Sequence, residues 1–103
     1  MSRRERISEE LDTLAPGIPD TDKTLILDHA EDSAGLRKGS PAKVAWLSMV
    51  AFIRHTYTDY DALLADGYDV ESARHFCVEQ INEVLEEWEC EKQVSAEPVG
   101  EGD

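Results

Sequence analysis

The sequence lacks a hydrophobic run long enough to cross a membrane. Its longest apolar stretch, Val44 to Ile53, is interrupted by Ser48 and is far shorter than the roughly 20 residues that a bilayer requires. The opening residues, MSRRERISEELDTLAPG, contain no apolar stretch of the length found in signal peptides. We therefore expect a soluble, cytoplasmic protein that has no membrane partner.

Positive charge is scarce. The 103 residues include 10 lysines and arginines against 23 aspartates and glutamates, which gives a net charge of -13. A surface of this charge repels polyanions, so we expect no direct binding of nucleic acid. The acidity is compatible with adaptation to a salt-rich cytoplasm. An ordinary solvated acidic surface is the favoured interpretation, and imitation of nucleic acid by a protein that occupies a nucleic-acid-binding partner is an alternative.

Cysteine is scarce as well, and the common catalytic motifs are missing. Cys77 and Cys90 fall in one predicted helix, which would hold them roughly 20 Å apart, too far for a disulfide. The sequence contains no HExxH pattern, no glycine-rich phosphate loop and no nucleophile elbow. We expect neither a metal nor another cofactor, and we leave open whether the protein is an enzyme, favouring a non-enzymatic role.

Patterns typical of strands are also missing, because no segment alternates between apolar and polar residues for long enough. Apolar residues instead recur every three or four positions, as at Ile7, Leu11 and Leu14. Such spacing is typical of helices that bury one face. The sequence therefore predicts an all-α fold.

The predicted architecture is a compact single-domain bundle of four to five helices. A nearly all-apolar helix at about 41–57 lies at its centre, and a long C-terminal helix spans about 70–90. The helical domain covers residues 1–92, with a break in the loop 33–39. Residues 93–103 are rich in Gly, Pro, Ser and acidic residues, which predicts a disordered acidic tail.

Several polar residues stand where helix caps are needed. Ser40 precedes Pro41, a combination typical of the start of a helix. Thr58 and Asp61 have the spacing of a capping pair for a short fourth helix that stops at Gly67, and Asp69 can cap the last helix. We predict Ser40, Thr58, Asp61 and Asp69 as capping residues.

The stretch RHTYTDYD, residues 54–61, is the strongest candidate for chemistry. His55 lies at the end of the central helix, close in sequence to Asp59 and Asp61. An imidazole with two carboxylates can bind a divalent cation or form an oriented general base. A metal-dependent hydrolase that uses these three residues is therefore an alternative function, although a catalytic zinc site normally needs three protein ligands in a recognisable spacing.

A structural interpretation of the same residues is stronger. Arg54 and Arg74 project from largely apolar helix faces, so their charges need carboxylates nearby. The nearest in sequence are Asp59, Asp61 and Asp69, so we predict an arginine–carboxylate network that joins the central helix to the last one. On this hypothesis Arg74→Ala lowers the melting temperature by several degrees.

One extended pattern resembles a known family. It comprises Arg54-His55, Thr58-Asp59-Tyr60-Asp61, Leu64, Gly67, Asp69, Ala73-Arg74, Ile81, Val84-Leu85 and Trp88. This arrangement, over about residues 40 to 90, resembles the small bacterial and fungal domain-of-unknown-function 2293 family. The resemblance implies a domain of this extent and transfers no reaction, ligand or catalytic residue.

The favoured function is therefore a protein–protein interaction module, whose partner is another protein or a second copy of the chain. Tryptophan is enriched among the residues that dominate interface energetics. Trp88, near the end of the long amphipathic helix, is the interface candidate, and its alternative place is the core.

Overall fold

The computed structural model describes residues 2–32 and 38–95, and these form five helices and no strands. The helices are α1 (Arg3–Leu14), α2 (Asp20–Asp32), α3 (Pro41–Tyr57), α4 (Tyr60–Ala65) and α5 (Val70–Glu87). The all-α prediction is confirmed. Within the described residues, no helix combines the length and the apolar character needed to span a bilayer. The predicted loop 33–39 falls mostly outside the described residues, as does the predicted tail from residue 96 onward.

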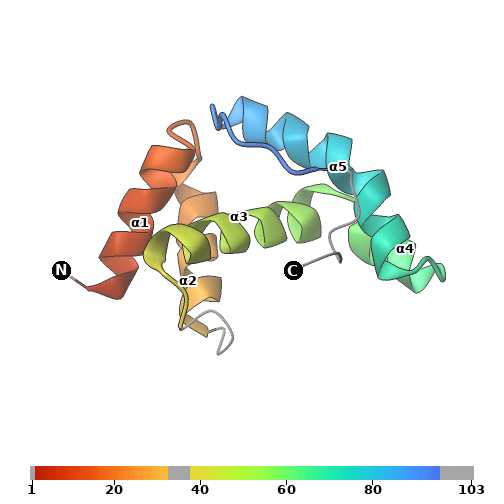
Figure 1. The fold of residues 1–103 in the computed structure, drawn as a ribbon, viewed down its shortest axis with the longest axis horizontal. Helices are drawn as coiled ribbons and strands as arrows, with labels where there is room; N and C mark the ends of the chain where they lie inside the picture. Colours follow the sequence, from red (N-terminus) through yellow and green to blue (C-terminus); the bar gives the residue numbers. More distant parts are fainter. Residues whose placement is uncertain (1, 33–37, 96–103) are drawn as a thin grey trace.

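The central helix is α3, which contacts all four other helices (Figure 1). It begins where the sequence predicts, because the Ser40 hydroxyl accepts a hydrogen bond from Lys43 N at 3.2 Å and Pro41 occupies the first turn. Val44, Met49 and Ile53 are no more than 1% exposed. A helix this apolar is stable in water only when other helices cover it, which explains its place.

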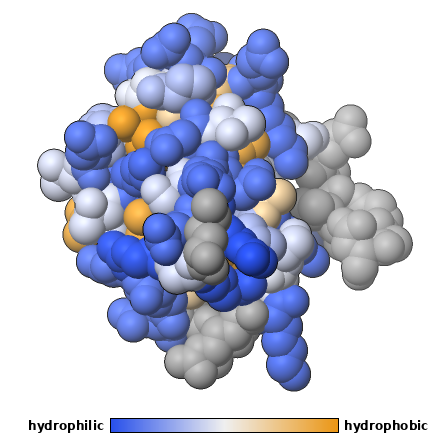
Figure 2. Space-filling view, turned by 90° about the vertical axis from the view of Figure 1, so that its left-hand side faces the viewer, coloured by the Kyte–Doolittle hydropathy of each residue, from blue (hydrophilic) through white to orange (hydrophobic). Residues whose placement is uncertain are grey.

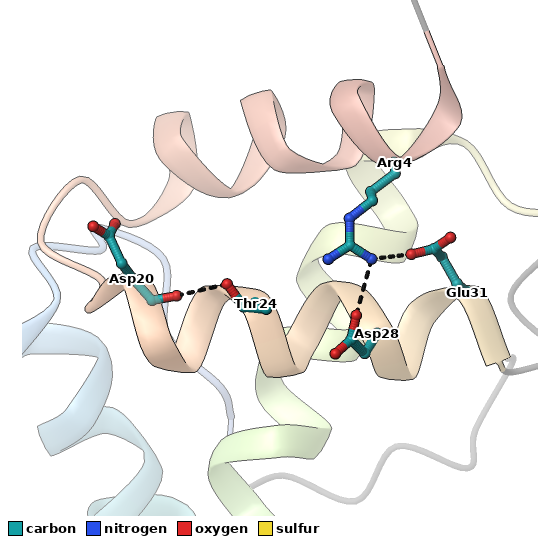
Figure 3. Close-up of polar contacts among 5 residues, drawn as sticks. All are labelled: Arg4, Asp20, Thr24, Asp28 and Glu31. Carbon is teal, nitrogen blue, oxygen red and sulfur yellow. Dashed lines mark hydrogen bonds and ion pairs between the residues drawn. The ribbon is translucent and has the colours of Figure 1, made fainter.

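The helices α1 and α2 pack side by side against one end of α3. Buried Ile7 and Leu11 on α1 meet buried Ile26 on α2 in the common core. At the surface, Arg4 forms ion pairs with Asp28 and Glu31 across the two helices (Figure 3). Hydrogen bonds to these carboxylates, that to Glu31 being the stronger influence, raise the pKa of Arg4. Because the ion pairs are exposed, they contribute much less to stability than the burial of the leucine and isoleucine side chains does. The face that includes α1 is mostly hydrophilic, with small apolar patches (Figure 2).

The last helix ends earlier than predicted, at Glu87 rather than near residue 90. Glu89 adopts a left-handed conformation, with φ of 61°. Cys90 N then donates to Leu85 O at 2.8 Å and Glu89 N donates to Glu86 O at 3.0 Å, the hydrogen-bond pattern of a Schellman cap. Glycine usually occupies the left-handed position, so the sequence contains no signal for this ending.

A close contact joins the turn after α1 to the end of α5. Gly17 N donates a hydrogen bond to Trp88 O at 2.9 Å. A Cβ atom at position 17 would lie 3.1 Å from the carbonyl carbon of Trp88 and 2.8 Å from a Glu89 carboxylate oxygen. Glycine therefore permits the close approach of the two backbones, and a larger residue would require the Trp88 backbone to shift by a few tenths of an ångström.

The chain then turns back along α5 (Figure 1). Asn82 on α5 accepts a hydrogen bond from Val94 N at 2.9 Å and donates one to Val94 O at 3.2 Å. Val94 also packs against the core. Residues 93–95, the first part of the predicted tail, are thus held against α5 in the structure.

Candidate functional site

The residues RHTYTDYD form the junction between α3 and α4. The Thr58 hydroxyl donates to Arg54 O at the end of α3 and accepts from Tyr60 N, at 3.2 Å, at the start of α4. Asp59, rather than Thr58, is the N-cap residue of α4, and its side chain makes no capping hydrogen bond. Thr58, which the sequence predicts as the N-cap residue, therefore links the two helices through a turn and stands one residue before the observed N-cap.

The three candidate catalytic residues are only partly brought together. His55 Nδ1 pairs with Asp61 Oδ2. This contact takes Asp61 away from its predicted capping role. The two side chains are 76% and 56% exposed, and no group of three or more potential metal ligands forms within residues 2–32 and 38–95.

The remaining predicted caps are placed as the sequence indicates. Asp69 is the N-cap residue of α5 and accepts a hydrogen bond from Ser72 N at 2.7 Å. This backbone hydrogen bond lowers the pKa of Asp69, because it stabilises the charged carboxylate. Ser40 caps α3 in the same way.

The predicted arginine–carboxylate network is not assembled. Neither Arg54 nor Arg74 makes an ion pair with Asp59, Asp61 or Asp69, all of which belong to the described residues. The Arg54 guanidinium instead lies 5.3 Å from the centre of the Tyr60 ring. Apolar packing holds these helices together in place of the network, since Ile53 of α3 belongs to the same hydrophobic cluster as Ile81 and Leu85 of α5.

Both arginines line an open groove between α3 and α5, which encloses about 1180 Å³. Its apolar wall includes Trp46 and Leu47 from α3 and Val70 and Phe76 from α5. Lys92, in the segment that follows α5, lies over the Trp46 ring at 4.4 Å. The groove thus combines exposed apolar surface with cationic side chains.

The electrostatics of the groove differ from those of the rest of the protein. The pKa of Arg54 is lowered mainly by burial and, to a smaller extent, by the nearby positive charge of Arg74. The Arg54 Nε atom is buried without a hydrogen-bond partner among the described residues. An unpaired donor of this kind is costly to bury, so the groove carries unsatisfied positive charge in a chain of net charge -13.

Sequence reasoning identifies the arginines but not the groove. Lys92 stands at the very end of the predicted domain, and the sequence assigns no role to Val70 or Phe76. A usable signal is present, because Val70, Arg74 and Val78 follow one another at intervals of four on α5. This second stripe lies beside the buried stripe that contains Cys77 and Ile81.

Trp88, the interface candidate, lies in the core. It is 6% exposed and packs within the main hydrophobic cluster. Its ring is therefore already covered within one chain, whereas Trp46 is only partly buried at the edge of the groove.

The chain matches one protein family. Residues 10–89 match the family described as "Uncharacterized conserved protein (DUF2293)". This range includes residues 10–14 of α1 and the whole of α2, α3, α4 and α5. No curated protein and no solved structure matches the chain.

Proposed function

The chain belongs to the DUF2293 family of uncharacterised conserved proteins, and we propose that it is a small non-enzymatic module that binds another protein in the groove between α3 and α5. A module of this kind needs no catalytic constellation. It needs an exposed apolar surface whose burial against a partner is energetically favourable.

The distribution of exposed apolar side chains carries this proposal. Leu47, Val70 and Phe76 are 41%, 47% and 57% exposed, and all three line the groove. Tyr68, 46% exposed, stands edge-on to Phe76 with ring centroids 5.5 Å apart. Contiguous apolar surface on a soluble chain is typical of a protein interaction site.

The size of the groove favours a segment of a protein over a small molecule. Pockets for small ligands usually enclose about 300–1,000 Å³ and cover most of the ligand. This groove has a volume of about 1180 Å³ and is partly open to solvent. A helix or an extended segment would fill it more completely than a metabolite.

A symmetric dimer through the same surface is disfavoured by charge. In a two-fold interface the same patch of each chain faces the other. The groove would then face the same groove of the second chain, and with it a second set of the three cations. Repulsion between the cations would oppose the contact.

The two alternative functions have less support. The hydrolase needs His55, Asp59 and Asp61 to converge, and only the pair of His55 and Asp61 is in contact. The nucleic-acid mimic is supported by the net charge of -13 and by Glu79, Glu83 and Glu86, which lie around a shallow depression on α5. A salt-sensitive pull-down of a nucleic-acid-binding protein would favour the mimic.

Site-specific cross-linking in the native cell tests the proposal. A photoreactive phenylalanine analogue replaces Phe76 in one variant and exposed Leu25, on α2 and outside the groove, in another. We expect a discrete adduct with a different protein at position 76 and none at position 25. The purified partner should then bind the unmodified chain, and Leu47→Glu should weaken the complex by at least tenfold, on the order of 1.4 kcal/mol.

Two results would contradict the proposal. One is the same set of adducts at positions 25 and 76, which would show no preference for the groove. The second is an adduct at position 76 that contains only another copy of the chain, which would identify a homodimer.

A further inference from the structure

Three cationic side chains line the groove: Arg54 from α3, Arg74 from α5 and Lys92 from the segment after α5. None of them forms an ion pair within the described residues. Arg6 and Lys43 also lack an ion pair within the described residues, so the three groove cations are set apart by lining one partly apolar surface rather than by being unpaired. Glu71 lines the same groove and pairs with none of the three.

Two of the three cations are held in place by contacts that leave their charge available. Lys92 lies over the face of Trp46 and Arg54 over the face of Tyr60. A cation–π contact orients the charged group without neutralising it. Arg74 is exposed on α5, and it is close enough to Arg54 that the two guanidinium groups repel each other.

The positive charge is concentrated at two points along the groove. Lys92 lies over the ring of Trp46. Trp46 and Arg54 are eight residues apart on α3, a distance of about 12 Å along the helix axis. Between these points the wall is apolar and contains Leu47 and Val50. The pattern along the groove is therefore charge, apolar surface, charge.

We propose that the groove binds an acidic, amphipathic segment of a partner protein, with one carboxylate at the Arg54–Arg74 pair, a second at Lys92 and apolar side chains between them. This inference rests on the proposed function and adds the chemistry of the partner. Carboxylates about 12 Å apart correspond to a spacing of about eight residues on a helix or about four residues in an extended chain.

Local pairing outweighs the net repulsion between an acidic segment and an acidic protein. At an ionic strength of about 0.1 M, charges further than roughly 10 Å apart are largely screened. The groove cations would touch the carboxylates directly and lose water on binding, so their attraction is much less screened. The net charge of -13 is expected to slow association more than it weakens the complex.

Carboxylates fit the groove better than phosphate. A phosphorylated side chain brings close to two negative charges to one point, and Glu71 and the surrounding acidic surface would repel the second charge. The Lys92 end offers one positive charge, which matches a single carboxylate, whereas the Arg54–Arg74 end offers two. A phosphorylated segment is therefore a separate possibility that the experiment distinguishes.

Peptide selection provides the test. A displayed library of random peptides, each about 16 residues long and so about 24 Å as a helix, is selected on the full chain and, in parallel, on the Arg74→Gln/Lys92→Gln variant. Both replaced side chains are exposed, so the variant should keep its fold, which circular dichroism verifies. We expect peptides selected on the unmodified chain to be enriched in Asp and Glu beside large apolar residues, and this enrichment to disappear on the variant.

Fluorescence anisotropy with one selected peptide then measures each contribution. Replacing either acidic residue of the peptide by glutamine should weaken binding roughly tenfold, as expected for a hydrogen bond to a charged group. Lys92→Gln and Arg74→Gln in the protein should each have a similar effect. Arg6→Gln, which removes an exposed arginine on α1 away from the groove, should leave the affinity unchanged.

Three outcomes would overturn the inference: selected peptides rich in basic residues, equal binding of the acidic peptide and its glutamine form, or tighter binding of a phosphoserine form. If any of these occurs while the Phe76 adduct persists, the groove binds a partner of different chemistry and the proposed function stands. If the adduct is absent, the proposed function itself fails.

Discussion

The indole ring of Trp88 stands edge-on to the ring of Tyr57, with the ring centroids 6.1 Å apart and the planes at 86°. Tyr57 in turn donates a hydrogen bond from its hydroxyl to Asp22 on α2, at 2.6 Å. The end of α5, the end of α3 and the start of α2 thus meet around one aromatic pair. The buried position of Trp88 gives it a structural role.

Trp88→Ala is expected to lower the free energy of unfolding by about 3–5 kcal/mol, since it removes a buried aromatic ring and leaves a cavity. Trp46→Ala, at the partly buried edge of the groove, should cost clearly less. Urea denaturation of both variants provides the measurement. Equal losses would contradict the assignment of Trp88 to the core and Trp46 to the groove.

Ser48→Ala is expected to raise the free energy of unfolding by about 1 kcal/mol. Ser48 is fully buried on α3, and its hydroxyl has no hydrogen-bond partner among the described residues. The control is Ser40→Ala at the start of the same helix, which removes a capping hydrogen bond and should cost about 1 kcal/mol. Chemical denaturation should show opposite signs, and a loss at both positions would indicate that the Ser48 hydroxyl is satisfied.

Glu89→Gly is expected to stabilise the protein by about 1 kcal/mol, because glycine adopts the left-handed conformation without the Cβ penalty. The matched control is Glu86→Gly, which places glycine inside α5 and should destabilise the protein by about 1 kcal/mol. Thermal unfolding compares the two variants. If both lose stability, the Schellman cap at Glu89 is not formed in solution.

Arg74→Ala is expected to change the free energy of unfolding by no more than about 0.5 kcal/mol. Its side chain is exposed and makes no ion pair within the part of the chain that the structure describes. The sequence alone leads to the opposite expectation, a fall in melting temperature of several degrees. Calorimetry of Arg74→Ala, with Arg6→Ala as the control, decides between the two expectations. A fall in melting temperature confined to Arg74→Ala would support the predicted arginine–carboxylate network.

Asp69→Asn is expected to reduce the acid sensitivity of the fold. The pKa of Asp69 is lowered from its ordinary value of 3.8 in the folded state, so the folded protein holds this proton less tightly than the unfolded chain. The stabilising contribution of Asp69 is complete above the unfolded pKa and is lost as the pH falls through the folded pKa. Asparagine still caps the helix but does not titrate.

Melting temperatures recorded from about pH 6 to about pH 2 test this linkage. The difference between the original chain and Asp69→Asn should shrink as the solution is acidified through the titration of Asp69. Curves that stay parallel over the whole range would rule out a contribution of Asp69 to acid unfolding.

Local signals in the sequence are sufficient for most of the fold. The prediction of the central helix at about 41–57 is confirmed, because Ser40 and Pro41 define its start and its apolar composition requires burial. The end of α5 is missed because Glu89 adopts a conformation that glycine usually takes. The start of α4 is displaced by one residue: the hydroxyl of Thr58, the predicted N-cap, donates back to Arg54 O of α3, and Asp61 pairs with His55.

The groove depends on tertiary packing, which explains why only its arginines are foreseen from local patterns. Arg54, Arg74 and Lys92 come from three separate segments, and their shared surface exists only after α5 packs on α3. Proximity in sequence suggests Asp59 and Asp61 as partners of the arginines. In the folded chain these carboxylates lie at the junction of α3 and α4, outside the groove.

The hydrogen bond between Gly17 and Trp88 has a mechanical consequence. It ties the turn before α2 to the residue that ends α5, and the tryptophan that supplies the carbonyl also has its ring in the core. A force that pulls on the C-terminal end of α5 would have to extract that ring and break the bond to the first turn in the same step. The helix therefore does not detach one turn at a time from this end. The applied force is transmitted at once to the N-terminal helices.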